Sequence, residues 1–113
     1  MDWSIPRDQW VARLKEFTNR NAGRRTVMEE DAPAMGAQEM EHDFPLRGVS
    51  YDHRDGRIDI MLGDMASTDR HVTRTIDEPV SVDLLRGPDG RDQALRIRHH
   101  QDAQTVLRLL RNG

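Results

Sequence analysis

Acidic side chains and two histidines in the middle of the chain are the groups whose types and spacing could do chemistry. Asp52, Asp59 and Asp64 fall here together with His53 and His71. Two carboxylates held side by side can share a proton for acid–base work, or they can bind a hard cation such as calcium. An enzyme or ion-binding protein built on these groups is one hypothesis for function, and solvated surface acids are the plainer alternative.

A related set of residues could hold a small ligand. Asp52, Asp64, His71 and Arg74 bring carboxylates, an imidazole and a guanidinium into one stretch of sequence. These four are the candidate ligand-binding residues. Whether they line one cleft depends on the fold that positions them.

Histidine spacing does not predict a metal site. His99 and His100 are adjacent, so within a strand their side chains point to opposite faces. His42, His53 and His71 fall on different expected elements. With no cysteine in the chain, a thiolate zinc site, a disulfide framework and a thiol nucleophile are all excluded. We expect no metal and no cofactor.

Arginines near the C-terminus could form a basic stripe for nucleic acid. Arg96 and Arg98 share one face of an expected strand, and Arg108 can join them from the next. Aromatic residues make up only 4% of the chain and concentrate near the N-terminus, so a base-stacking platform is not expected. Residues 24–69 carry five basic and eleven acidic groups, whereas residues 70–113 carry eight and six. We therefore expect the acidic and the basic segment to neutralise each other across neighbouring strands, and we do not expect nucleic-acid binding.

Composition narrows the class of protein further. The chain has 113 residues and a net charge of −3, which fits one domain spanning 1–113 and not a polyanion binder that works by bulk charge. It has no apolar run of membrane-spanning length and no signal-peptide pattern, so a cytoplasmic location is expected. Of the 17 basic residues only Lys15 is a lysine, a skew typical of GC-rich bacterial genomes.

The N-terminal segment predicts an amphipathic helix over about 6–21. Trp10, Leu14 and Phe17 recur at helical spacing and form one apolar stripe. Pro6 suits the first turn, Ser4 or a neighbour can cap the start, and Asn21-Ala22-Gly23 supplies the end. The aromatic stripe must be buried against another element.

After Gly23 the pattern becomes alternating, which predicts a hairpin over Gly48–Leu62. Asp55-Gly56 is a preferred two-residue turn, and it would place Tyr51 opposite Ile60 and Asp52 opposite Asp59. The inward-facing residues of this hairpin and the next are expected to be Val49, Tyr51, Ile58, Ile60, Val82 and Leu95.

Other strands are expected along the rest of the chain. A second hairpin over Val80–Arg86 and Arg91–His99 needs a four-residue loop, Gly87–Gly90, or an equivalent bulge to keep its apolar residues on one face. An apolar corner is expected at Phe44-Pro45-Leu46, because Pro45 cannot donate to a ladder. The remaining strands are expected at Thr26–Met28, Ala37–Glu41, His71–Ile76 and Gln104–Leu110.

Together these elements predict an α+β domain. One N-terminal amphipathic helix, about 6–21, packs on a curved antiparallel sheet of six to eight short strands between about 24 and 110, and the sheet can approach a barrel-like form.

Several short motifs occur in an order that resembles a known family. They are Ile5-Pro6-Arg7 with Trp10, Pro45-Leu46-Arg47-Gly48-Val49-Ser50, Ile60-Met61-Leu62-Gly63-Asp64 and His71-Val72-Thr73-Arg74-Thr75-Ile76. In this order they resemble a bacterial family of small domains of unknown function, and the resemblance covers nearly the whole chain. It implies a single domain and carries no assigned activity.

The expected function is a non-catalytic domain that binds a protein partner or itself. No nucleophile motif and no phosphate-binding loop is present, so the sequence leans away from an enzyme. A sheet of short strands has edges that need cover, and a homodimer through an edge strand or the Trp-bearing face would supply it.

Overall fold

The computed structural model describes residues 2–32, 36–63, 71–99 and 102–110, which form one α-helix, one short 3-10 helix and an eight-stranded antiparallel sheet. The predicted α+β class is confirmed. In chain order the elements are β1 (Asp2–Ile5), η1 (Arg7–Gln9), α1 (Trp10–Asn21), β2 (Arg25–Ala32), β3 (Gly36–Asp52), β4 (Arg57–Gly63), β5 (His71–Asp77), β6 (Ser81–Arg86), β7 (Asp92–Arg98) and β8 (Gln104–Leu109).

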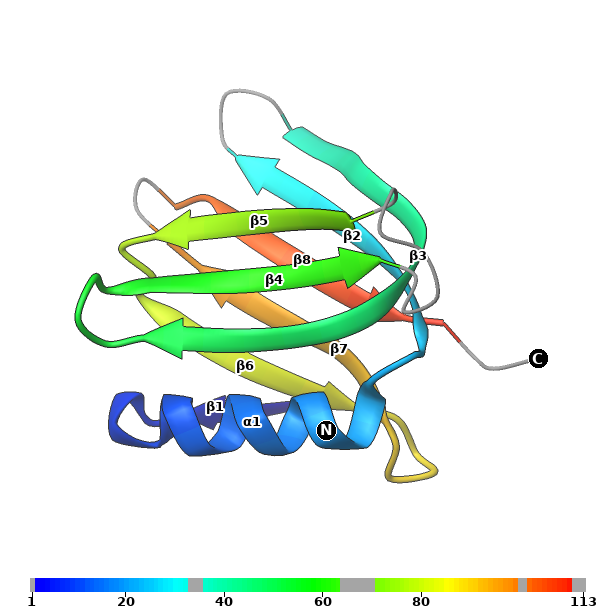
Figure 1. The fold of residues 1–113 in the computed structure, drawn as a ribbon, viewed down its shortest axis with the longest axis horizontal. Helices are drawn as coiled ribbons and strands as arrows, with labels where there is room; N and C mark the ends of the chain where they lie inside the picture. The colour runs from blue at the N-terminus through cyan, green and yellow to red at the C-terminus, as the bar shows by residue number, and fades with distance from the viewer. Residues whose placement is uncertain (1, 33–35, 64–70, 100–101, 111–113) are drawn as a thin grey trace.

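The long strand β3 joins two layers of one sheet. The strand order is β1-β6-β7-β8-β2-β3-β4-β5. The first half of β3 pairs with β2 as far as Pro45, and its second half pairs with β4 from Leu46 onward. The layer of β4, β5 and the second half of β3 therefore lies in front of β6, β7, β8 and β2 (Figure 1). The predicted apolar corner at Phe44-Pro45-Leu46 coincides with the point where β3 passes from β2 to β4, and the missing N–H of Pro45 is tolerated there.

The core lies between the two layers, and the predicted inward faces are confirmed. Val49, Ile58 and Ile60 are buried in the front layer, and Val82 and Leu95 are buried in the back layer. Tyr51 is partly buried and packs against the same cluster.

Helix α1 covers one open side of this folded sheet. It runs along the lower side in Figure 1, where it lies between β3 in front and β6 behind. Trp10, Leu14 and Phe17 are buried as predicted, and the Trp10 ring meets Tyr51 edge to face at 5.0 Å. Within the described ranges no helix has the length and hydropathy that crossing a membrane requires. The sheet does not close into a barrel, and among the described strands β1 and β5 are its edges.

Thr18 fixes α1 to β3 where the two elements approach closely. Its hydroxyl accepts the Val49 N–H at 2.9 Å and donates to the Val49 carbonyl at 3.1 Å. A Cβ on Gly48 would lie 3.3 Å from the Thr18 methyl group, so glycine permits this approach.

Replacing Thr18 with the isosteric valine should lower the free energy of unfolding by about 1–3 kcal/mol, because the Val49 N–H would lose its partner. Urea denaturation would measure the change. Ser50→Ala, at an exposed strand position, is the control and should have little effect on stability. Equal stability of the two variants would contradict this role for Thr18.

The N-terminus contains a strand that the sequence did not predict. Asp2–Ile5 forms β1 and pairs with β6, so Ser4 lies opposite Asp83 and does not cap the helix. The predicted cap is therefore wrong. After Pro6 the chain makes the 3-10 turn η1, and α1 begins at Trp10 with no side-chain cap. Gly23, with a φ of +89°, follows the helix end as predicted.

The β3–β4 hairpin has the predicted faces but a different register. The Asp52 carboxylate accepts the Arg54 N–H at 2.9 Å, and this turn lengthens the loop to residues 53–56. Asp52 consequently lies opposite Arg57, and Asp59 lies opposite Ser50. The predicted facing pair of Asp52 and Asp59 is wrong. A shift of two positions leaves every side chain on its expected face.

The β6–β7 hairpin is shifted in the same way. Val82 lies opposite Ile97 and Leu84 opposite Leu95, with an irregularity between Leu85 and Arg86. The predicted four-residue loop Gly87–Gly90 is wrong, because residues 87–91 lie between the strands, and the alternative, a bulge, is found instead. The predicted pairing of Val82 with Leu95 is also wrong. The strand starts at Ser81, and the preceding residue, Val80, is exposed.

Candidate functional site

The residues predicted to bind a ligand are not gathered at one point among the described residues. Asp52 lies opposite Arg57 at the start of β4, and His71 lies opposite Gly63 at its end. The seven residues of β4 extend over about 20 Å from one of these ends to the other. Asp64 lies outside the described residues, so a site that includes it stays a prediction.

Each of the described candidates has a local role. Asp52 holds the hairpin turn, and the N–H groups of Arg54 and Asp55 lower the pKa of its carboxyl. His71 contacts Arg47, with 2.8 Å between the guanidinium Nη1 and the imidazole Nδ1. Arg74 lines a small pocket between β5 and the back layer, together with Glu30. The other candidate acid, Asp59, accepts a hydrogen bond from Thr75 at 2.7 Å.

No cluster of three or more His, Asp or Glu side chains suited to a metal occurs in the described parts of the chain. His53 lies in the β3–β4 loop, whereas His71 starts β5, so these two histidines do not converge. The side chain of His42 lies outside the described residues.

The predicted arginine stripe lies on one face of β7 and β8, and acids from neighbouring strands interleave with it. Arg96 donates to Asp83 at 2.9 Å, and Arg108 donates to Glu29 at 2.8 Å. Arg98 is exposed on the same face. Of these two pairs, Arg108–Glu29 joins the basic segment 70–113 to the acidic segment 24–69, as the charge distribution predicted, whereas Arg96 and Asp83 both belong to 70–113.

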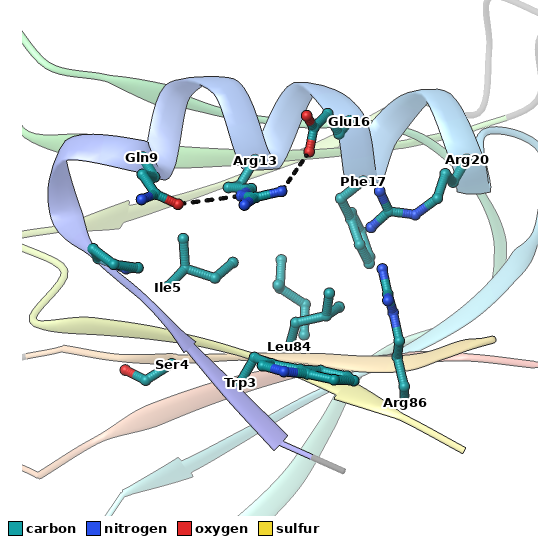
Figure 2. A pocket seen from close by; sticks show the side chains of 12 residues that line it. Trp3, Ser4, Ile5, Gln9, Arg13, Glu16, Phe17, Arg20, Leu84 and Arg86 are labelled. Atoms are coloured by element: carbon teal, nitrogen blue, oxygen red, sulfur yellow. Dashed lines mark hydrogen bonds and ion pairs between the residues drawn. The ribbon is translucent and has the colours of Figure 1, made fainter. Parts of the chain in front are cut away.

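A pocket of about 320 Å³ opens between β1, α1 and β6. Its inner wall is apolar and includes Ile5, Phe17 and Leu84 (Figure 2). Trp3 lies across it from the edge strand β1 and keeps 44% of its surface exposed. The pocket therefore combines an apolar wall with an accessible aromatic ring.

Guanidinium groups border this pocket. Figure 2 shows Arg20 from α1 and Arg86 from β6 extending toward each other beside Phe17. Arg86 also lies over the Trp3 ring, with its central carbon 5.1 Å from the ring centroid. Arg13 lies further along the helix and pairs with Glu16 at 3.2 Å.

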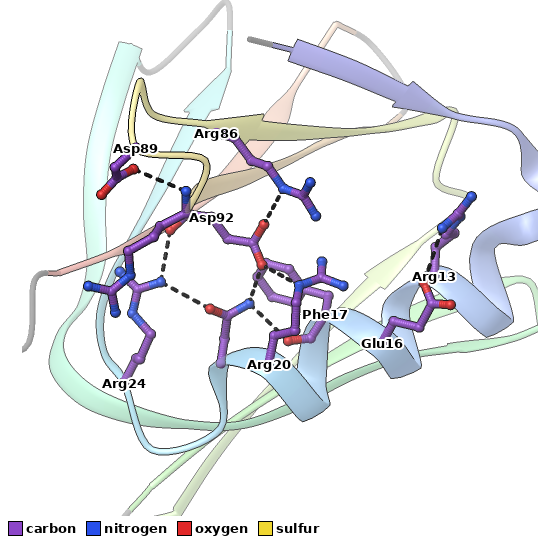
Figure 3. Close-up of polar contacts among 10 residues, drawn as sticks. Arg13, Glu16, Phe17, Arg20, Arg24, Arg86, Asp89 and Asp92 are labelled. Atoms are coloured by element: carbon purple, nitrogen blue, oxygen red, sulfur yellow. Dashed lines mark hydrogen bonds and ion pairs between the residues drawn. The ribbon is translucent and has the colours of Figure 1, made fainter.

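The buried carboxylate of Asp92 organises these arginines. Arg20 Nε donates to its Oδ2 at 2.9 Å, Arg86 Nε donates to its Oδ1 at 2.8 Å, and Asn21 donates at 2.6 Å (Figure 3). Arg24 completes the cluster by donating to the Asn21 side-chain oxygen and to the Asp92 backbone carbonyl. Two guanidinium groups thus bind one carboxylate, and a third binds the backbone carbonyl of the same residue.

Burial and hydrogen bonding act on the pKa of Asp92 in opposite directions. Burial raises the pKa, but the hydrogen bonds from Asn21, Arg86 and Arg20 outweigh it, and the pKa lies below its usual value. Burial, followed by the nearby Arg91 cation, lowers the pKa of Arg24. Asp92 is therefore ionised at neutral pH and serves as the fixed counter-charge of the cluster.

One signal for this cluster was present in the sequence. Asn21 continues the buried stripe of Trp10, Leu14 and Phe17, so a polar amide at a core-facing position required a buried partner. Its place before Ala22-Gly23 indicates only the end of the helix. Asp92 itself gave no signal, because it lies next to a turn where exposed acids are common.

A family model described as a family of unknown function, DUF5335, matches residues 1–112. The chain belongs to DUF5335. The predicted resemblance to a small domain of unknown function is thereby confirmed. No curated protein and no solved structure matches the chain.

For this DUF5335 chain, two features can make contact with another molecule. One is the pocket of α1, β1 and β6, with its ordered guanidinium groups. The other is the outer edge of β5, to which no described strand is paired.

Proposed function

We propose that this DUF5335 chain is a non-catalytic module that self-associates through the outer edge of β5. The observation that carries the proposal is the position of β5 at the end of the sheet order. An edge strand presents N–H and C=O groups that another strand can pair with.

The alternation of backbone groups identifies the residues that present them. The Glu78 N–H donates to the Gly56 carbonyl, so the even-numbered positions of β5 direct their backbone groups toward β4. The odd-numbered positions direct theirs to the outer edge. These are His71, Thr73, Thr75 and Asp77.

The sequence of β5 is self-complementary about its central residue. If two copies pair antiparallel around a two-fold axis at Arg74, His71 of each copy meets Asp77 of the other. The same register places Thr73 opposite Thr75, which suits a cross-strand hydroxyl pair. It also brings the two Arg74 side chains together, and an acid, Glu30, lines the same pocket as Arg74.

Proline at position 73 tests this interface. The Thr73 N–H faces the outer edge, so Thr73→Pro removes an intermolecular donor without removing a bond to β4. We expect light scattering at about 100 µM, a concentration suited to a micromolar association, to give twice the chain mass of 13.1 kDa for the wild type and the single-chain mass for Thr73→Pro.

Thr73→Ala is the matched control, because it keeps the backbone donor and should stay dimeric. Circular dichroism must show that Thr73→Pro retains the sheet. A wild-type chain that is monomeric at this concentration, or a Thr73→Pro variant that is folded and still dimeric, would overturn the proposal.

A further inference from the structure

We propose that the pocket between β1, α1 and β6 binds a small organic monoanion, in which a carboxylate is carried on a flat apolar body. This site is separate from the β5 edge and does not depend on self-association. Its volume of about 320 Å³ is in the range of small-molecule sites.

Guanidinium groups are the charged groups that border the pocket on its α1 and β6 sides. Arg13 pairs with Glu16, whereas Arg20 and Arg86 share the single carboxylate of Asp92. Arg24 adds a further guanidinium behind the pocket wall. A monoanion would balance the guanidinium groups at the pocket mouth.

The geometry of the arginines suits a carboxylate. Asp92 engages both Arg20 and Arg86 through Nε, which fixes the direction of each side chain before a ligand arrives. Asp92 occupies Nε of Arg20, and the two terminal nitrogens form the other edge of the guanidinium. This edge can donate two parallel hydrogen bonds to a second carboxylate. Since the Arg20 side chain is 41% exposed, this edge is accessible from solvent.

The apolar part of the ligand has its own partners. Ile5 and Leu84 line the pocket and keep part of their surface accessible, and the fully buried Phe17 and Leu95 support them from the core. Trp3 faces this surface from β1 and offers an exposed indole ring for stacking (Figure 2). A flat ring held between Trp3 and the apolar wall would place its carboxylate beside Arg20 and Arg86.

Naphthoate is a suitable probe, and its neutral amide, naphthamide, has nearly the same shape. We expect calorimetry on the full chain to give a naphthoate Kd below about 1 mM and binding of naphthamide at least about tenfold weaker, because the charge-assisted hydrogen bonds are lost. Amide chemical shifts should change at Trp3, Phe17 and Leu84.

Three variants test the residues, and two control for them. Arg20→Gln and Trp3→Ala should each weaken naphthoate binding at least about tenfold, and Arg13→Gln should weaken it about threefold.

Arg98→Gln removes an exposed arginine from the far strand face and Val80→Ala removes an exposed apolar side chain, and both should bind as the wild type does. Thr73→Pro should also bind normally, which separates this site from the β5 edge.

Equal affinity for naphthoate and naphthamide would overturn the proposal, as would no binding of naphthoate up to about 5 mM. Wild-type affinity of both Trp3→Ala and Arg13→Gln would overturn it as well. If Arg20→Gln does not fold, these two variants decide, because Trp3 and Arg13 are exposed and lie outside the Asp92 cluster.

Discussion

Asp92→Asn should lower the free energy of unfolding by about 2–4 kcal/mol at neutral pH. Removing one partner of a buried ion pair costs about 3–5 kcal/mol, because the other charge is left uncompensated. The Asp92 side chain is only 3% exposed, but Arg20 and Arg86 are 41% and 31% exposed, and water reduces the cost of leaving them unpaired.

The effect of this substitution should depend on pH with a definite sign. Because the pKa of Asp92 is lower in the folded chain than in the unfolded chain, its contribution to stability is present above the unfolded pKa, about 3.9. The contribution is lost as the pH falls through the folded pKa. Urea denaturation at neutral pH and in acid should therefore show the stabilities of wild type and Asp92→Asn converging in acid.

Asp55→Asn is the matched control, because Asp55 is 57% exposed and its ion pair with Arg57 spans 3.5 Å at the surface. Its cost should stay within about 1 kcal/mol. The assignment of Asp92 as the organising charge fails if the two variants lose equal stability, or if the loss for Asp92→Asn does not change with pH.

Trp10→Ala should destabilise the fold by about 3–5 kcal/mol, which is typical of truncating a buried tryptophan. Trp10 is 1% exposed, donates its indole N–H to the Ile5 carbonyl at 2.8 Å and packs on Tyr51. Its loss would leave a void at the point where α1, β1 and β3 meet. Denaturation followed by circular dichroism measures the change.

Two further variants separate the parts of this effect. Trp10→Phe keeps an aromatic ring but loses the donor to Ile5, and it should cost less than Trp10→Ala. Trp3→Ala truncates the exposed tryptophan of the same region and should cost less than about 1.5 kcal/mol. Equal losses in the free energy of unfolding for Trp3→Ala and Trp10→Ala would contradict this role for Trp10.

Alternation in the sequence was sufficient to predict which side chains enter the core, but not the pairing of the strands. In both hairpins the register differs by two positions from the prediction, and such a shift preserves every inward face. The turns decide the register, and the side-chain hydrogen bond of Asp52 favours a loop longer than Asp55-Gly56 alone.

Elements whose partners lie far along the chain were the hardest to predict. The strand β1 has four residues ahead of Pro6, and only its pairing with β6 makes it a strand. Similarly, Pro45 indicates a corner, but only the pairing shows that one strand continues through it from β2 to β4. The Asp92 cluster joins residues from α1, β6 and β7, so no local pattern could contain it.

The pairing of β1 has a consequence for the folding pathway. Trp3 lies opposite Leu84, so the first strand of the chain cannot find its partner until most of the chain is present. The loop entropy of such distant contacts slows folding relative to local hairpins. During synthesis β1 has no partner until residues 81–86 have been made, so the pocket wall that contains Trp3 cannot form before β6 is present.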